Sequence, residues 1–174
     1  MSVAVDGFPS REELRRSPGY PSEERLDRGA CAVIECVQEI PCNPCETVCP
    51  YGAIKVGQPI TNLPRLDAEL CKGCGLCLAV CPGQAIFLVD KAFAPGEALV
   101  GFPYEYVPLP AAGERVPATN RAGEVVAEGR VIRVVNSSRN DRTPVVFLAV
   151  PLEVADEVRS MERRGQKPRP GQGE

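Results

Sequence analysis

The feature that most constrains this chain is a duplicated cysteine pattern between residues 32 and 91. Six residues of the first copy have identical partners 32 positions later. The pairs are Cys42 and Cys74, Cys45 and Cys77, Cys49 and Cys81, Pro50 and Pro82, Ala53 and Ala85, and Ile54 and Ile86. A repeat with one fixed offset predicts two copies of the same structural unit. Each copy reads as a strand, a cysteine-bearing loop, one or two helical turns and a second strand.

The second copy carries four closely spaced cysteines. Cys71, Cys74, Cys77 and Cys81 follow the spacing C-x2-C-x2-C-x3-C, and a proline comes next. This spacing is typical of [4Fe–4S] binding, in which three cysteines hold one cluster and the fourth holds the other. Three thiolates on one loop can surround a face of a cubane, whereas the fourth lies on the helical turn behind the loop and points away.

The first copy departs from this spacing at its opening cysteine. It matches the last three cysteines of the second copy, but position 39, the counterpart of Cys71, is glutamate. Cys36 lies three residues upstream of that position, in the spacing C-x5-C with Cys42. We predict that this loop is longer and that Cys36 supplies the missing thiolate.

Eight of the nine cysteines are thereby assigned to two clusters. Cluster one is predicted to be held by Cys36, Cys42, Cys45 and Cys81, and cluster two by Cys71, Cys74, Cys77 and Cys49. Cys31 is left over, and we expect it to be a buried structural thiol. The alternative is that Cys31 replaces Cys36 as a ligand.

Two other metal assignments compete with this one. Structural zinc sites also use four cysteines, but they favour two separated C-x2-C pairs. A single cluster, with the first copy degenerate, is the other alternative because Cys36 is displaced. The continuous run in the second copy favours iron–sulfur clusters over zinc.

Residues 32–90 closely resemble the two-cluster bacterial ferredoxin domain. The resemblance is carried by the repeat, by both Cys-Pro pairs and by the Ala-Ile that follows each of them. It implies an α+β fold, a pseudo-twofold βαββαβ module, with the crossed ligation assigned above.

A second resemblance involves residues 33–45 and 60–64. These segments are similar to the small ferredoxin-like subunits of multi-subunit FAD-dependent amino-acid dehydrogenases, of the proline, hydroxyproline and sarcosine-oxidase-like kind. The resemblance implies a flavoprotein partner that oxidises a secondary or N-methylated amino acid.

The rest of the chain is predicted to form appendages to residues 30–91. Residues 1–29 form an extension in which Ser10 begins a short helix with a capping box. Residues 92–112, rich in proline, are predicted to be a linker or arm. Residues 113–164 are predicted to form a small antiparallel sheet, a hairpin of 123–135 and 145–150 joined by 115–119, plus a C-terminal helix over 151–161. Disorder is expected for 165–174.

The composition excludes several other functions. The 20 basic and 23 acidic residues give a net charge of −3, and no segment is one-sidedly basic as nucleic-acid binding requires. The chain has no histidine, and neither G-x-G-x-x-G nor G-x4-G-K-[ST] occurs. We therefore expect no catalytic site in the chain itself.

These observations predict an electron-transfer subunit with two [4Fe–4S] clusters, in a hetero-oligomer with a flavoprotein dehydrogenase. The alternative is a free, diffusible ferredoxin, although such a carrier needs little beyond the cluster module. An oxygen-sensing regulator is a third hypothesis, but no DNA-reading element supports it. No basic-then-apolar leader or apolar run of roughly 18 residues is found. We therefore expect a cytoplasmic protein without a membrane span, in which clustered cysteines bind metal.

Overall fold

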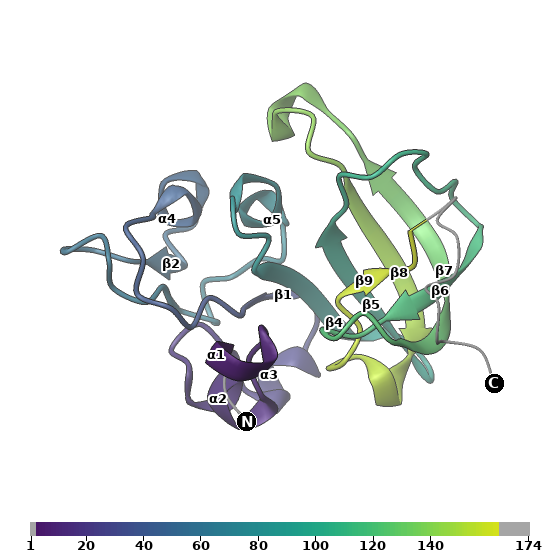
Figure 1. The fold of residues 1–174 in the computed structure, drawn as a ribbon, viewed down its shortest axis with the longest axis horizontal. Helices are drawn as coiled ribbons and strands as arrows, with labels where there is room; N and C mark the ends of the chain where they lie inside the picture. Colours follow the sequence, from purple (N-terminus) through teal and green to yellow (C-terminus); the bar gives the residue numbers. More distant parts are fainter. Residues whose placement is uncertain (1–2, 164–174) are drawn as a thin grey trace.

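The computed structural model describes residues 3–163 (Figure 1). Within these residues the α-helices are α1 (Val3–Asp6), α2 (Arg11–Arg16), α3 (Glu23–Leu26), α4 (Pro44–Val48) and α5 (Leu76–Val80). The strands are β1 (Cys31–Ile34), β2 (Ile54–Lys55), β3 (Arg65–Leu66), β4 (Ile86–Ala94), β5 (Glu97–Pro103), β6 (Arg115–Thr119), β7 (Val125–Val135), β8 (Val145–Pro151) and β9 (Ser160–Met161). Two 3-10 turns are η1 (Ser138–Asn140) and η2 (Leu152–Val154). The α+β class is confirmed, and residues 165–174, where disorder is predicted, lie outside the described part.

The cysteine-bearing repeat folds in the order β1-α4-β2-β3-α5-β4. β1 pairs with β4 and β2 pairs with β3, both antiparallel, and α4 lies beside α5 (Figure 1). The copies are tied together by equivalent backbone hydrogen bonds. Asp67 N–H donates to the Ala53 carbonyl at 2.7 Å, and 32 residues away Glu35 N–H donates to the Ala85 carbonyl at 2.8 Å. The two halves are therefore related by an approximate twofold.

The N-terminal residues pack on this module. α2 has the predicted capping box, with Ser10 and Glu13 bonded to each other's backbone N–H groups. Leu14 and Leu26 are almost fully buried. The segment between α2 and α3 is also bonded to the repeat, since the Gly19 carbonyl accepts from Ile34 N–H at 3.1 Å. The extension is thus part of the same core.

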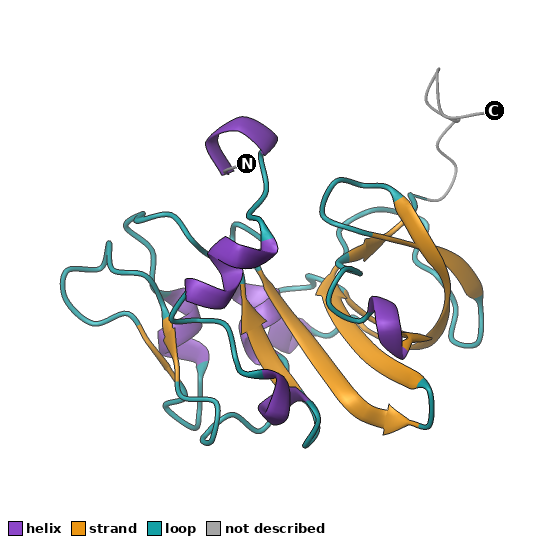
Figure 2. Ribbon diagram, turned by 90° about the horizontal axis from the view of Figure 1, so that it is seen from below, coloured by secondary structure: helices purple, strands orange, loops and turns teal. Residues whose placement is uncertain are grey.

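A seven-stranded sheet, in the order β1-β4-β5-β8-β7-β6-β9, joins the module to the C-terminal half. In Figure 2 its long strands run through the middle of the molecule, between most of the helices and the curled C-terminal strands. The predicted β7–β8 hairpin and its partner strand β6 are confirmed.

The prediction of a linker over 92–112 is wrong for residues 92–94 and 97–103, which belong to strands. β4 continues to Ala94, and β5 pairs along its length with β8. Gly96, with φ +76°, makes the turn between β4 and β5. Of the prolines that suggest a linker, Pro95 lies in that turn and Pro103 ends β5, whereas Pro108 and Pro110 follow the strand. The apolar residues between Pro95 and Pro103 are mostly buried.

The helix predicted over 151–161 is also wrong. Only the single 3-10 turn η2 forms, and β9 follows it. Ala155, Val158 and Met161 are buried, so their spacing reported burial and not helical structure. The Arg159 N–H donates at 2.9 Å to the Thr119 carbonyl of β6, because this edge of the sheet offers the segment a strand partner.

The β1–β4 pair separates two hydrophobic cores. On one face Ala32, Ile34, Ile86 and Leu88 pack with the cysteine loops. On the other face Cys31, Val33, Phe87 and Val89 pack with the C-terminal strands. Side chains alternate between the faces of a strand, so one strand pair supports both halves of the molecule. In the stretch from 3 to 163, no helix combines the length and the apolar character that crossing a bilayer would require.

Candidate metal centres

The last cysteine of each copy adopts nearly the same backbone conformation. Cys49 and Cys81 follow α4 and α5 as C-cap residues, with φ, ψ of −72°, 106° and −76°, 110°. The Cys49 sulfur accepts a hydrogen bond from Ala53 N–H at 3.3 Å, and the Cys81 sulfur accepts one from Ala85 N–H at 3.4 Å. These N–H···S bonds fix the positions of the two sulfurs, and such bonds are a feature of cysteine-ligated clusters.

Four cysteines from both copies line a small, more enclosed pocket beside β1. They are Cys49, Cys71, Cys74 and Cys77, the four assigned to cluster two from the sequence. Apolar side chains such as Ala32, Ile54 and Leu88 form much of the remaining wall. The pocket thus combines thiol donors with a largely apolar wall.

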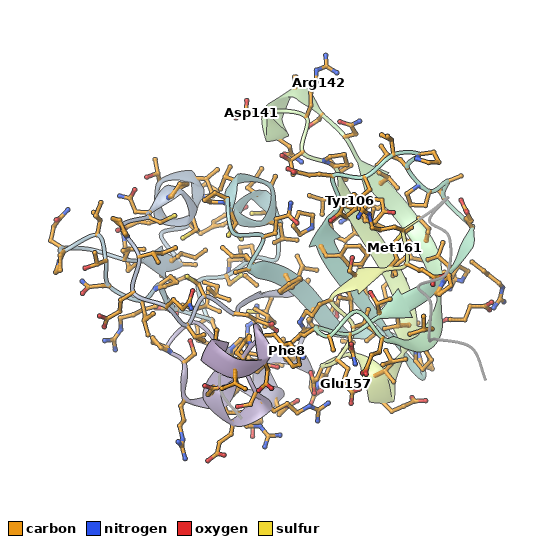
Figure 3. The ribbon with its side chains drawn as sticks, in the orientation of Figure 1. Phe8, Tyr106, Asp141, Arg142, Glu157 and Met161 are labelled. Atoms are coloured by element: carbon orange, nitrogen blue, oxygen red, sulfur yellow. The ribbon has the colours of Figure 1, made fainter. Side chains whose placement is uncertain are left out.

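The other four cysteines line a larger, more open groove. They are Cys36, Cys42, Cys45 and Cys81, the four assigned to cluster one. The groove extends beyond them to the N-terminal segment at Phe8 and to the segment after β5 at Tyr106, both labelled in Figure 3. Cys36 is half-buried in this groove.

The donor set fits iron–sulfur clusters. All nine cysteines are free thiols, and the eight assigned ones divide into two groups of four around two spaces. Burial raises the pKa of Cys45 to about 11, with the charge of Cys81 acting in the same direction. Burial also raises the pKa of Cys77. Buried thiols of this kind become thiolates when a cation is present to compensate their charge.

Cys71 differs from the other cysteines. A hydrogen bond from the Cys31 thiol lowers its pKa to about 5, aided by the Ala32 and Gly73 N–H groups and by the charge of Arg25, against the opposing effect of burial. The Ala32 N–H lies 3.4 Å from the Cys71 sulfur. These neighbours favour the thiolate form of Cys71.

Cys31 lines neither of the two cavities. It is fully buried in β1, on the face toward the C-terminal strands. Its hydrogen bond to Cys71, together with burial, raises its own pKa. The expected burial of this thiol is confirmed, and its predicted role as a structural thiol stays a prediction.

Sequence reasoning missed an ionic cluster beside the groove. The buried Glu35 carboxylate accepts from Arg159 Nε at 2.6 Å and from Arg121 Nε at 2.7 Å, and it also accepts from Arg121 Nη2. Burial by itself would raise the pKa of Glu35, but the two guanidinium groups outweigh it and hold that pKa below its usual range. The arginines lie about 90 and 120 residues away in the chain, and no local pattern predicts them.

Comparison with known families gives the class of this module. The profile of the LdpA Fe–S cluster-binding domain matches residues 36–92. The match begins at Cys36 and includes all of the other assigned cysteines. Residues 36–92 are therefore an iron–sulfur cluster-binding, ferredoxin-like domain.

Curated relatives match between 28% and 40% of the chain. An isethionate sulfite-lyase activating enzyme of Desulfovibrio desulfuricans is 37% identical over 71 residues, which is 40% of this chain and 22% of the relative. A subunit of the ion-translocating oxidoreductase complex of Methanosarcina acetivorans is 47% identical over 49 residues, 28% of this chain and 17% of the relative. An uncharacterized ferredoxin of Methanocaldococcus jannaschii is 42% identical over 50 residues, 29% of this chain and 28% of the relative.

These similarities cover only part of this chain and a smaller part of each relative. The chain covers between 17% and 28% of the length of these three relatives, so the likeness concerns iron–sulfur binding and electron transfer and not a whole protein. No solved structure gives a significant match to the chain.

Proposed function

We propose that this protein is an electron-transfer subunit that relays electrons through two [4Fe–4S] clusters to or from a flavoprotein dehydrogenase in a hetero-oligomeric complex. Cluster one is held by Cys36, Cys42, Cys45 and Cys81, and cluster two by Cys71, Cys74, Cys77 and Cys49. The observation that carries the proposal is the division of eight cysteines into two sets of four around two neighbouring spaces.

The ligand count favours relay over catalysis. A bound cluster supplies a delocalised one-electron redox couple, whose potential depends on net charge, hydrogen bonding and exposure. Four cysteines per cluster leave no iron open to a substrate. The protein's own residues would hold the thiolates, surround cluster two with a largely apolar wall and leave cluster one on the side of the open groove.

The complex is supported by two observations. One relative is named as a subunit of an ion-translocating oxidoreductase complex. The flavoprotein partner, with a secondary or N-methylated amino acid as its substrate, is supported by the resemblance of residues 33–45 and 60–64 to dehydrogenase subunits. A reducing cytoplasm is the compartment in which these thiols would stay available to iron.

The test is anaerobic purification of the chain from its native host at natural abundance. We expect about eight iron and eight sulfide per chain, since each cluster contributes four of each. We also expect stoichiometric association with a flavin-containing protein, and no amino-acid oxidation by the isolated chain. A zinc-containing or metal-free chain would overturn the proposal.

The second candidate is a free ferredoxin, which the similarity to a protein named as a ferredoxin favours. The same purification distinguishes the two. A single small brown species on gel filtration, with no flavoprotein attached, would support the carrier. Turnover of an amino acid by the chain alone would contradict both candidates.

A further inference from the structure

Arg25 connects the N-terminal extension to the loop that opens the second copy. Its Nε donates to the Ala68 carbonyl at 2.7 Å, and its Nη2 donates to the Cys71 carbonyl at 2.9 Å. The same guanidinium donates to the carbonyls of Gly29 at 3.0 Å and Ala30 at 3.3 Å. One side chain thus joins the backbone just before β1 to the loop that runs from Ala68 to Cys71.

The two backbone segments are in close contact at this point. A Cβ atom placed on Gly73 would lie 2.6 Å from the Ala30 Cβ and 2.7 Å from the Ala30 carbonyl oxygen. Ala32 N–H, two residues further along, donates to the Cys71 sulfur at 3.4 Å. Cys71 is therefore fixed from the same neighbouring segment at both its carbonyl and its sulfur.

Within residues 3–163, Arg25 makes no hydrogen-bonded ion pair, although the nearby Glu69 carboxylate interacts with its charge. Its four acceptors are neutral carbonyls, whereas the nearby Glu69 forms its ion pair with Arg28. Arg25 is half-buried, so solvent screens its charge less than that of a fully exposed side chain. A positive charge near a cluster favours the reduced state, which carries one more negative charge.

We propose that Arg25 is a positioning residue for cluster two, which fixes the backbone carrying Cys71 and raises the midpoint potential of cluster two relative to cluster one. This inference rests on the proposed function, because it takes the two clusters and their ligands from there. It assigns to the N-terminal extension a part in the redox site, outside the duplicated cysteine motif.

The first measurement compares Arg25→Gln, Arg25→Lys and Arg28→Gln with the wild-type protein. Each purified protein is titrated anaerobically, and the reduced clusters are followed by EPR. The signal that survives in Cys36→Ala identifies cluster two. Arg28→Gln is the matched control, since it removes the same charge three residues away, but Arg28 bonds Glu69 and no carbonyl near Cys71.

We expect Arg25→Gln to lower the midpoint potential of cluster two and to leave that of cluster one unchanged. Arg25→Lys keeps the charge but loses the forked hydrogen bonds. It should hold the potential nearer the wild-type value, while cluster two is lost faster to an iron chelator. Arg28→Gln should change neither property.

Equal shifts in Arg25→Gln and Arg28→Gln, or a shift in both clusters alike, would reduce the effect to general surface charge and overturn the inference. Unchanged potentials and chelation rates in both Arg25 variants would also overturn it. Selective loss of cluster two from Arg25→Gln would support a positioning role for Arg25. The midpoint potential of cluster two would then be measured in Arg25→Lys. Absence of two clusters from the wild-type protein would instead refute the proposed function, before any variant is measured.

Discussion

The two copies of the repeat are alike after their helices α4 and α5 and differ before them. After α4 and α5 the two copies share the backbone conformation of Cys49 and Cys81 and the N–H···S bonds from Ala53 and Ala85. Before these helices they differ. The second copy presents Cys71 in an enclosed cavity, and the first presents Cys36, displaced in sequence, in an open groove.

The neighbours of each copy account for this difference. The ends are held by antiparallel strand pairing inside the module, with an equivalent backbone hydrogen bond in each half. The beginnings face different partners, because Arg25 bonds the loop of the second copy, whereas the segment around Phe8 lies at the groove of the first copy. In the first copy, Glu35 directly precedes Cys36 and binds Arg121 and Arg159. The duplicated core thus positions Cys49 and Cys81 alike, and the appendages determine what surrounds the opening cysteine of each copy.

The largest expected effect is loss of one cluster or the other. Cys36→Ala should remove cluster one and Cys71→Ala should remove cluster two, each lowering the iron content from about eight to about four per chain. The EPR signal that remains should differ between the two variants. Iron analysis and EPR of anaerobic protein check this prediction.

Cys31→Ala is the matched control for both variants. It removes a buried thiol from the same strand region, but it lines neither cavity, so both clusters should remain. If Cys31→Ala lost a cluster and Cys36→Ala lost none, the ligand would have to be reassigned to Cys31.

The next effect concerns stability and compares Glu35 with its repeat counterpart Asp67. Glu35→Gln leaves Arg121 and Arg159 buried without a carboxylate, and breaking a buried ion pair costs about 3–5 kcal/mol. Asp67 is exposed, and its carboxylate only accepts from nearby backbone N–H groups. Asp67→Asn keeps an acceptor oxygen, so its cost should be below about 1 kcal/mol. The free energy of unfolding, measured in denaturant under anaerobic conditions, gives both values.

A similar, small cost for both substitutions would contradict this comparison. It would mean that water reaches the arginines when the carboxylate is neutralised. The ion pairs of Glu35 with Arg121 and Arg159 would then contribute little to the free energy of unfolding, although they connect the module to the C-terminal half.

Local sequence patterns predicted the parts of the fold that local interactions determine. The capping box of α2 and the strands β6, β7 and β8 depend on neighbouring residues and on alternation, and all four are confirmed. The repeat offset grouped the cysteines into the same two sets that line the two cavities, although ligation itself stays a prediction.

The errors arose where a distant strand decides the structure. Residues 97–103 were predicted as linker because prolines flank them, but pairing with β4 and β8 makes them a strand. Residues 151–161 have helical spacing of apolar residues, but the edge of β6 captures the end of the segment. Arg25 and Arg159 could not be singled out, since their partners lie far away in the sequence and are in part backbone carbonyls.

A smaller effect is expected at Gly73, where the first copy has Pro41. Gly73 has φ +63°, and an added Cβ would meet the Ala30 backbone at 2.7 Å. Gly57 has a similar φ of +68° with open space around it. Gly57→Ala should therefore cost only the left-handed strain of about 1–2 kcal/mol. Gly73→Ala should cost a further 1–3 kcal/mol or so from overpacking, and it should speed the loss of cluster two.

Unfolding free energies and chelation rates of the two glycine variants separate steric contact from backbone strain. Equal costs, with cluster two equally stable in both, would show that the loop can move away from Ala30. That result would also weaken the case for a rigid second copy, because the contact with the N-terminal extension would then be adjustable.

The smallest effect distinguishes the copies at a single backbone position. Gly52 has φ +62°, and its counterpart Gln84 has φ +49°, so a side chain occupies the left-handed region in the second copy only. Gln84→Gly relieves about 1–2 kcal/mol of strain but gives back about 0.5–1 kcal/mol in chain entropy. A net stabilisation of roughly 0.5 kcal/mol should follow, with a loss of about 1 kcal/mol for Gly52→Ala, in paired denaturation curves. If Gln84→Gly were destabilising, the Gln84 side chain, which lines the groove of cluster one, would have to contribute an interaction there that outweighs its strain.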